Sequence, residues 1–460
     1  GIDSVAVLPF TYSGGDANLE FLGDGLTEQI LNNLAQLPSL RVTARPSVFM
    51  YKGQPADPKE AGQKLGVRAV VMGRIAQQGG RVTVQVDLVD AVSGAQIWGR
   101  RYESGPSEVQ SLEREISAAI GSKLRPDLTV EQQQRVGRQH TASPEAYRLY
   151  LEGLHHFNAQ TLARMERSSE LYRQAIDKDP GFALAQAGLA DAYSYIGFFE
   201  SRSPLEIMPL AKAAAQRALR INPNLGEAHT SLGIVQLVYD FDAPAAEASF
   251  RRATELAPGN AYSLHWHAHY LETVGRTREG LGELQKSLDL DPISSIIRND
   301  IAFHHYMNGR DGEAIDMART VKDIDPGFPF ALSTLGLAQI RSGLTTEAIA
   351  SLEKALALAP GDPQSVAGLV SAHTREGRRE EARKHLESML KPNAHGYVPS
   401  YSVAVAYAGF GDRGQCLRWL ERAFQERSVF VMLYARYDPR LEPVRDDPRY
   451  VELLKTLPRP

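Results

Sequence analysis

Hydrophobic and polar positions change their period along the chain. Ser4 to Phe10 is an almost continuous apolar run, which is typical of a buried strand. Between Asp24 and Leu34 the apolar residues recur every three or four positions, as on one face of a helix. From 81 to 89 apolar and polar residues alternate, which predicts a strand with one solvated face. This mixture of periods predicts an α/β fold for the first part of the chain.

The predicted elements of residues 1–124 follow the order β-α-β-α-β-β-β-α, which suits a mixed sheet with helices packed against it. Asp24, with Thr27 and Glu28, fits an N-terminal cap for the first helix. Gly79-Gly80 fits a tight turn between two strands, because glycine tolerates positive φ. The remaining elements are strands at 40–44, 67–75 and 95–102 and helices at 57–65, ending at Gly66, and 109–124.

The second part of the chain repeats itself. Four prolines lie 34 residues apart, each after a helical run: Pro258, Pro292, Pro326 and Pro360. Proline cannot continue a helix, so each marks the turn from one unit to the next. A period of 34 is typical of helix-turn-helix repeats. We expect a polar linker at 125–143, about eight repeats over 144–435 and a capping segment at 436–460.

The first part also carries three phrases of a known family, in that family's order. They are SVAVLPF, FLGDGLTEQILNNLAQLPSLRVTARPSVFMYKG and LGVRAVVMGRIAQQGGRVTVQVDLVDAVSGAQIWGRRYE. Residues 4–124 thereby resemble the TolB-like amino-terminal domain. That domain often precedes tetratricopeptide repeats in bacterial adenylate cyclases of class III, serine/threonine kinases and winged-helix regulators. The resemblance implies an output domain N-terminal to these residues, which in cyclases and kinases of this kind is enzymatic.

The repeats resemble tetratricopeptide units. Their first helices carry a large residue followed by a small one, as in Leu232-Gly233 and Leu335-Gly336. Their second helices carry a large residue and an alanine, as in Phe250/Ala253 and Leu352/Ala355. Small residues let two helices approach closely while large ones fill the gap. The resemblance implies an all-α tetratricopeptide superhelical solenoid behind the α/β mixed-sheet domain.

Composition narrows the classes of partner. The chain has 51 basic and 55 acidic residues, a net charge of −4, so no strongly basic field favours nucleic acid. Cys416 is the single cysteine, which excludes an internal disulfide and suggests a small buried hydrophobe. The sequence contains no run of 18 apolar residues, so it predicts no membrane span. Gly1 leads into a strand without an initiator methionine, so we expect a piece of a longer protein. A bacterial origin is expected, and the cytoplasmic and periplasmic sides of a membrane-anchored protein both stay open.

The repeat frame predicts a partner-binding groove. In tetratricopeptide arrays, positions 2, 5, 9 and 12 of each first helix form one stripe that lines a concave surface. Counting from Ala261, these positions are aromatic and aliphatic with a few hydrogen-bonding groups, which suits a peptide with apolar side chains. The stripe comprises Tyr262, His265, His269, Glu272, Ile296, Asn299, Phe303, Tyr306, Phe330, Ser333, Leu337 and Ile340.

Two other interpretations of this stripe stay open. The same side chains could pack between repeats without binding anything. His265 and His269, four residues apart, share a helical face and could hold a metal ion. Such a site needs a third ligand, and there is no HExxH motif, so we expect no metal. His267-Ala268, where Leu-Gly is usual, makes this unit the place to look for a ligand.

No motif predicts catalysis or a cofactor. Ser13-Gly14-Gly15-Asp16 and Gly23-Asp24-Gly25 match neither phosphate-loop pattern, so we expect turns and a helix cap there. The favoured function is recognition of a protein or peptide by a regulatory or sensory module of a bacterial signalling protein. A scaffold for an envelope complex is the alternative, and an enzyme with metal chemistry at the histidines is the third. Self-association of the chain is left open.

Overall fold

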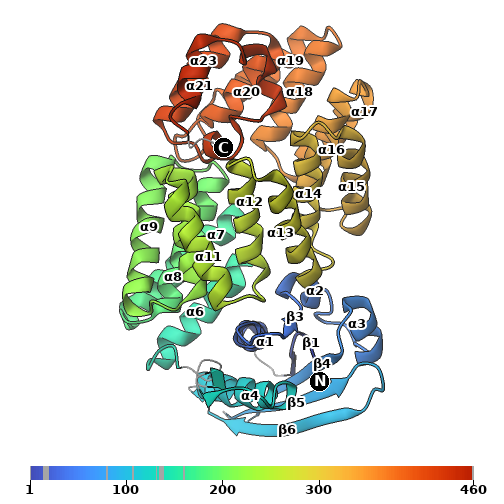
Figure 1. The fold of residues 1–460 in the computed structure, drawn as a ribbon, viewed down its shortest axis with the longest axis vertical. Helices are drawn as coiled ribbons and strands as arrows, with labels where there is room; N and C mark the ends of the chain where they lie inside the picture. The colour runs from blue at the N-terminus through green and yellow to red at the C-terminus, as the bar shows by residue number, and fades with distance from the viewer. Residues whose placement is uncertain are drawn as a thin grey trace.

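The computed structural model of the chain describes residues 2–13, 20–78, 81–105, 108–130, 132–133, 139–158 and 161–457. An α/β domain lies at one end of the long axis, and a curved array of helix pairs fills the rest of the molecule (Figure 1). The predicted fold class, a mixed-sheet domain followed by a helical solenoid, is therefore confirmed.

The sheet of the N-terminal domain is mixed. Its strand order is β3-β1-β4-β5-β6, with β2 beside β4. β1 runs parallel to β3 and β4, whereas β4, β5 and β6 are antiparallel. All four residues of β1 are buried, as its continuous apolar run predicts. The strands are β1 (Ser4–Val7), β2 (Thr11–Ser13), β3 (Arg41–Val42), β4 (Ala69–Gln78), β5 (Arg81–Asp90) and β6 (Gln96–Ser104).

Four described helices accompany the sheet. Ile30 and Leu34 of one helix share a core with Ile116 and Ile120 of another and with the strand valines. The third helix ends at Gly66, whose φ of 63° lies in the left-handed region that favours glycine. The helices are α1 (Glu20–Ala35), α2 (Arg45–Phe49), α3 (Pro58–Leu65) and α4 (Val109–Leu124).

Some details of the sequence prediction are wrong in this domain. Because α1 begins at Glu20, Gly23-Asp24-Gly25 lies inside the helix, and Asp24 binds other side chains instead of capping it. The sequence pattern does not predict β2 and α2, which at three and five residues are too short for a period to emerge. The turns expected at 13–16 and 79–80 lie outside the described residues, apart from Ser13 at the end of β2.

The array consists of antiparallel helix pairs. The helices before the four evenly spaced prolines end at Leu256, Leu290, Ile324 and Leu358, each two residues before its proline, so the predicted stops are confirmed. The described pairs are α6 (Pro144–Phe157) with α7 (Leu162–Lys178), α8 (Ala183–Phe198) with α9 (Pro204–Ile221), α10 (Gly226–Val235), continued by η3 (Gln236–Asp240), with α11 (Ala243–Leu256), α12 (Ala261–Thr273) with α13 (Thr277–Leu290), α14 (Ser295–Met307) with α15 (Asp311–Ile324), α16 (Pro329–Arg341) with α17 (Thr345–Leu358), α18 (Pro363–Arg375) with α19 (Arg379–Met389), and α20 (Ser400–Phe410) with α21 (Arg413–Gln425).

Close approach explains the small residues of the repeat. A Cβ added to Gly233 would lie 2.8 Å from a ring carbon of Phe250, and one added to Gly336 would lie 2.5 Å from Cγ of Leu352. Each large residue of a second helix thus occupies the space that a glycine of the first helix leaves free. Cys416 is fully buried in α21, as predicted.

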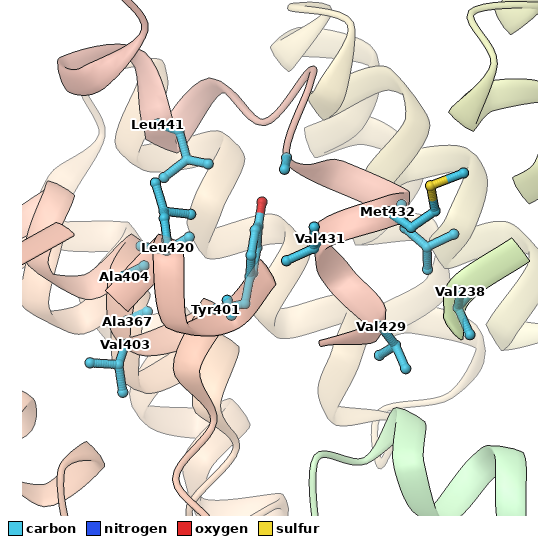
Figure 2. Close-up of a cluster of buried hydrophobic side chains, with 14 of the residues drawn as sticks. Val238, Ala367, Tyr401, Val403, Ala404, Leu420, Val429, Val431, Met432 and Leu441 are labelled. Atoms are coloured by element: carbon cyan, nitrogen blue, oxygen red, sulfur yellow. The ribbon is translucent and has the colours of Figure 1, made fainter. Parts of the chain in front are cut away.

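The chain after the last pair turns back into the array. It forms α22 (Val429–Tyr434), the 3₁₀ turn η4 (Pro439–Val444) and α23 (Pro448–Leu454). α23 covers α21, where Arg449 pairs with Glu421. Figure 2 shows α22 between Tyr401 of the last pair and Val238 of η3, so one apolar core joins early and late repeats.

Candidate functional site on the concave face

The predicted stripe lies on α12, α14 and α16, the first helices of three consecutive pairs. None of these side chains is fully exposed. The partly exposed members are Tyr262, Glu272, Ile296, Phe303 and Phe330. The buried members are His265, His269, Asn299, Tyr306, Ser333, Leu337 and Ile340.

Aromatic side chains of α22 cover part of this stripe. The ring of Tyr434 lies 5.2 Å from that of Phe303, measured between centroids. Phe430 stacks on Tyr434 at 5.6 Å and meets Phe198 edge-on at 5.2 Å. Aromatic rings at such spacings stabilise one another in addition to the free energy gained from burying their apolar surface. The chain's own C-terminal segment, residues 427–441, therefore occupies the middle of the concave face.

Polar contacts fix the C-terminal segment in place. At its start, Arg427 donates from Nη1 to the carbonyl oxygen of Tyr239 at 2.7 Å. At its end, the hydroxyl of Tyr401 donates to Oδ2 of Asp438 at 2.9 Å, and Arg440 pairs with the same carboxylate at 2.7 Å. Asp438 is fully buried, so loss of Arg440 would leave its carboxylate charge uncompensated, and loss of Tyr401 would remove one of its hydrogen bonds.

A histidine and carboxylate cluster lies on α12 and α14. Nε2 of His269 lies 3.2 Å from Nε2 of His265 and 3.6 Å from Oδ2 of Asp300. Nε2 of His265 also contacts Oδ2 of Asp300. Beside this trio, Glu272 bonds to Nδ1 of His304 and lies 3.9 Å from Nδ1 of His269. Sequence reasoning found both histidines of the trio but missed the aspartate.

Both histidines of the trio are buried, Asp300 is partly buried, and the three side chains shift one another's pKa values. Burial by itself raises the pKa of Asp300, but the neighbouring His265 and His269 outweigh it, so this pKa lies below its ordinary value. Burial lowers the pKa of His269, yet the nearby carboxylate of Asp300 raises it above its ordinary value. Two imidazoles thus share one carboxylate in a place from which water is largely excluded.

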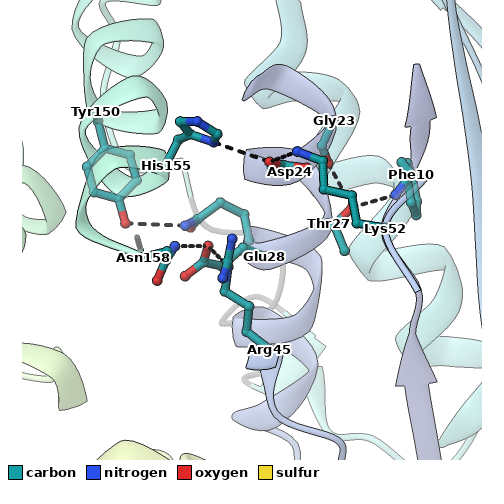
Figure 3. Close-up of polar contacts among 11 residues, drawn as sticks. Phe10, Gly23, Asp24, Thr27, Glu28, Arg45, Lys52, Tyr150, His155 and Asn158 are labelled. Atoms are coloured by element: carbon teal, nitrogen blue, oxygen red, sulfur yellow. Dashed lines mark hydrogen bonds and ion pairs between the residues drawn. The ribbon is translucent and has the colours of Figure 1, made fainter. Parts of the chain in front are cut away.

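The α/β domain meets the array through a polar network between α1 and α6, drawn in Figure 3. Nδ1 of His155 lies 3.2 Å from Oδ2 of Asp24, which also accepts from Lys52 at 2.7 Å. One turn further along α1, Glu28 accepts from Arg45 at 2.8 Å and from Asn158 at 2.7 Å. Burial exceeds these stabilising contacts and raises the pKa of Glu28.

The α/β domain makes a second contact with the array, at the turn between α13 and α14. The backbone N–H of Ala44 donates to the carbonyl oxygen of Leu290 at 2.7 Å. The hydroxyl of Ser47 contacts Asp291 and accepts from the N–H of Ile293 at 3.2 Å. The domain therefore bridges the first pair of the array and its middle.

Comparisons with known proteins agree with this architecture. The Tetratricopeptide repeat family matches residues 339–398. The protein called Putative adenylate cyclase 3 of Rhizobium meliloti is 30% identical over 236 residues, which are 50% of this chain and 40% of that protein. The Tol-Pal system protein TolB of Alkalilimnicola ehrlichii is 31% identical over 121 residues, 26% of this chain and 28% of that protein. The chain thus spans less than half the length of either relative.

Solved structures with similar folds superpose on this chain with low TM-scores. Human IFIT1, solved as a dimer with m7Gppp-AAAA, superposes with a TM-score of 0.48 at 15% identity, covering 69% of this chain and 81% of that one. YrrB, described as a tetratricopeptide protein with an unusual peptide-binding site, gives 0.30 at 19% identity, covering 45% and 99%.

Fold and relatives together define a helical repeat scaffold, a class that is typically non-enzymatic. More specifically, the chain has a TolB-like N-terminal domain followed by a tetratricopeptide repeat region. Such repeats serve protein–protein interaction. None of the described helices is long and apolar enough to cross a membrane.

Proposed function

We propose that this protein recognises a peptide or protein segment on the concave face of its repeats. The observation that carries the proposal is the position of α22, a short helix with apolar and aromatic side chains, against that face. A surface that accepts one such helix has the shape and chemistry to accept another, in the helix-in-groove manner of peptide recognition.

The partner's segment takes the place of α22 or extends beside it along α14 and α16. Ile296 and Phe330 are partly exposed there and provide apolar contacts. Because α22 belongs to the same chain, it competes at an effective concentration on the order of millimolar. A partner must exceed this competition, so weakening α22 should strengthen binding.

Binding is transmitted through the α/β domain. That domain contacts the array near His155 of α6 and again near Asp291, at the turn after α13. Any bend of the array between these two points changes their separation and strains the α/β domain. We assign the chain a regulatory role in a bacterial signalling protein, supported by its 30% identity to the protein called Putative adenylate cyclase 3.

Affinity capture tests the groove. Purified chain is used as bait in lysate of the source bacterium, and the captured proteins are quantified by mass spectrometry. We expect Ile296→Ala and Phe330→Ala to reduce capture of specific partners, and Tyr434→Ala to increase it. Ile324→Ala, at an exposed apolar residue outside the stripe, is the matched control and should change nothing. Undiminished capture by both groove variants would refute the proposal.

A second candidate is a scaffold of an envelope complex, favoured by the 31% identity to the Tol-Pal system protein TolB. The coding sequence upstream of Gly1 separates the two. A cyclase, kinase or winged-helix domain there supports signalling, whereas a secretion signal or lipobox cysteine supports the scaffold.

A further inference from the structure

Three ligand atoms converge on one point between α12 and α14. Nε2 of His265, Nε2 of His269 and Oδ2 of Asp300 all lie within 4.8 Å of one another, a grouping that stands out among the described residues. The two nitrogens are 3.2 Å apart, and the longer nitrogen–oxygen separation is 3.6 Å. Ligand atoms about 2.0 Å from a tetrahedral zinc ion lie roughly 3.3 Å from one another, so the two separations that involve His269 match a metal site, while His265 and Asp300 are in closer contact.

Hydrogen bonds alone do not account well for the arrangement of these three side chains. If Nε2 of His265 donates its proton to Asp300, that nitrogen has no lone pair left to accept a hydrogen bond from Nε2 of His269. If His269 donates instead, its distance of 3.6 Å to Asp300 exceeds that of a good hydrogen bond. A cation, by contrast, binds all three atoms at once.

A surrounding carboxylate supports the same assignment. Ligating histidines usually present their other ring nitrogen to a carboxylate, which fixes the ring and raises its basicity. Here Oε2 of Glu272 lies 3.9 Å from Nδ1 of His269, and its other oxygen bonds to Nδ1 of His304. At 3.9 Å Glu272 is too far for a hydrogen bond to His269, but its charge faces the Nδ1 side of the ring while Nε2 faces the trio.

We propose that His265, His269 and Asp300 form a binding site for a divalent first-row transition metal. Two imidazoles and one carboxylate favour ions such as Zn²⁺ and Co²⁺ over Mg²⁺ and Ca²⁺, which prefer oxygen ligands. Three protein ligands leave a fourth position open. The ion joins the first helices of two consecutive repeats and so stiffens the concave face beside Tyr434.

Titration of the tag-free chain with Co²⁺ alone, followed by visible absorption, tests the site, and Zn²⁺ competition gives its affinity. We expect one equivalent per chain. His269→Gln and Asp300→Asn should weaken binding by more than the roughly 10- to 100-fold that loss of an outer carboxylate, as in Glu272→Gln, costs. His267→Gln is the matched control, because this residue lies on the same helix but contacts Glu283 instead, and it should bind like wild type.

A measurement on wild type makes the test independent of variant folding. X-ray absorption of the zinc-loaded chain should show a first shell of nitrogen and oxygen with the outer-shell scattering of two imidazoles. Circular dichroism confirms that each variant is folded. Absence of saturable binding, equal binding by wild type and folded Asp300→Asn, or fewer than two imidazoles at the zinc ion would overturn the proposal.

Discussion

Tyr147→Phe should uncouple the α/β domain from the array in a pH-dependent manner. The hydroxyl of Tyr147, on α6, donates to Oε2 of Glu113 on α4 at 2.7 Å, and Asn33 on α1 donates to the other oxygen. All three side chains are buried. Burial raises the pKa of Glu113 to about 7, although the hydrogen bonds from Tyr147 and Asn33 oppose that shift. The substitution removes one hydrogen bond and almost no volume.

The magnitude follows from the charge of the acceptor. At pH 6, below its pKa of about 7, Glu113 is mostly neutral, and the lost bond is worth about 1 kcal/mol. At pH 8 it is mostly ionised, and a bond to a charged group is worth about 1.5–3 kcal/mol. Because the folded pKa exceeds that of the unfolded chain, stability falls as pH rises from about 4.5 to about 7. Loss of the Tyr147 hydroxyl raises the pKa of Glu113 further, so the fall extends to higher pH and becomes larger.

Urea unfolding at pH 6 and pH 8, followed by circular dichroism, measures both differences. Tyr12→Phe is the matched control, because its hydroxyl donates to the neutral side chain of Gln77 at 3.0 Å. The control should lose under about 1 kcal/mol, equally at both pH values. An equal loss for Tyr147→Phe at the two pH values would refute the assignment of Glu113 as a titrating group in the domain interface.

Other perturbations test the array itself. Burial raises the pKa of Glu200 to about 8, so the stability that its protonated form contributes is lost as pH rises from about 4.5 to about 8. Glu200→Gln removes this effect, which is on the order of a few kcal/mol, and should make the melting temperature depend less on pH over that range. Gly336→Val should cost about 1–3 kcal/mol in thermal unfolding, because its Cβ would lie 2.5 Å from Cγ of Leu352, whereas Gly282→Val, with open space around it, should lack this clash. Tyr434→Ala should increase hydrogen exchange across residues 427–441, and unchanged protection there would contradict its role as an anchor.

Sequence patterns predicted correctly those features that depend on contacts between residues close together in the chain. The proline stops, the small–large pairs and the strand alternation each depend on residues within one repeat or hairpin, such as Gly336 and Leu352. The position of the first helix was not predicted correctly, because Gly23-Asp24-Gly25 resembles a turn in isolation. The contacts of Asp24 with Lys52 and His155, far along the chain, hold it in a helix.

Contacts between different repeats left weaker signals in the sequence. Asp300 follows His265 by one repeat period plus one residue, so it falls beside the predicted stripe position Asn299 rather than on it. The return of the C-terminal segment had a signal in the six consecutive apolar residues of Val429–Tyr434, a run that a solvated cap would not carry. Its destination beside Phe303 depends on the curvature of the whole array, which no single unit encodes.

The unusual His267-Ala268 pair is explained by packing rather than by a ligand. The ring of His267 stacks on Tyr270 at 6.1 Å and lies 6.3 Å from the ring of Phe250 on the preceding helix, α11. Ala268 is fully buried and keeps the small residue that the repeat requires. Residues two apart on a helix point roughly 200° apart, so His267 faces away from the face shared by its neighbours at 265 and 269. The proposed metal site therefore depends on the position of Asp300 beside His265 and His269. On α12, His269 provides the test substitution and His267 provides its control.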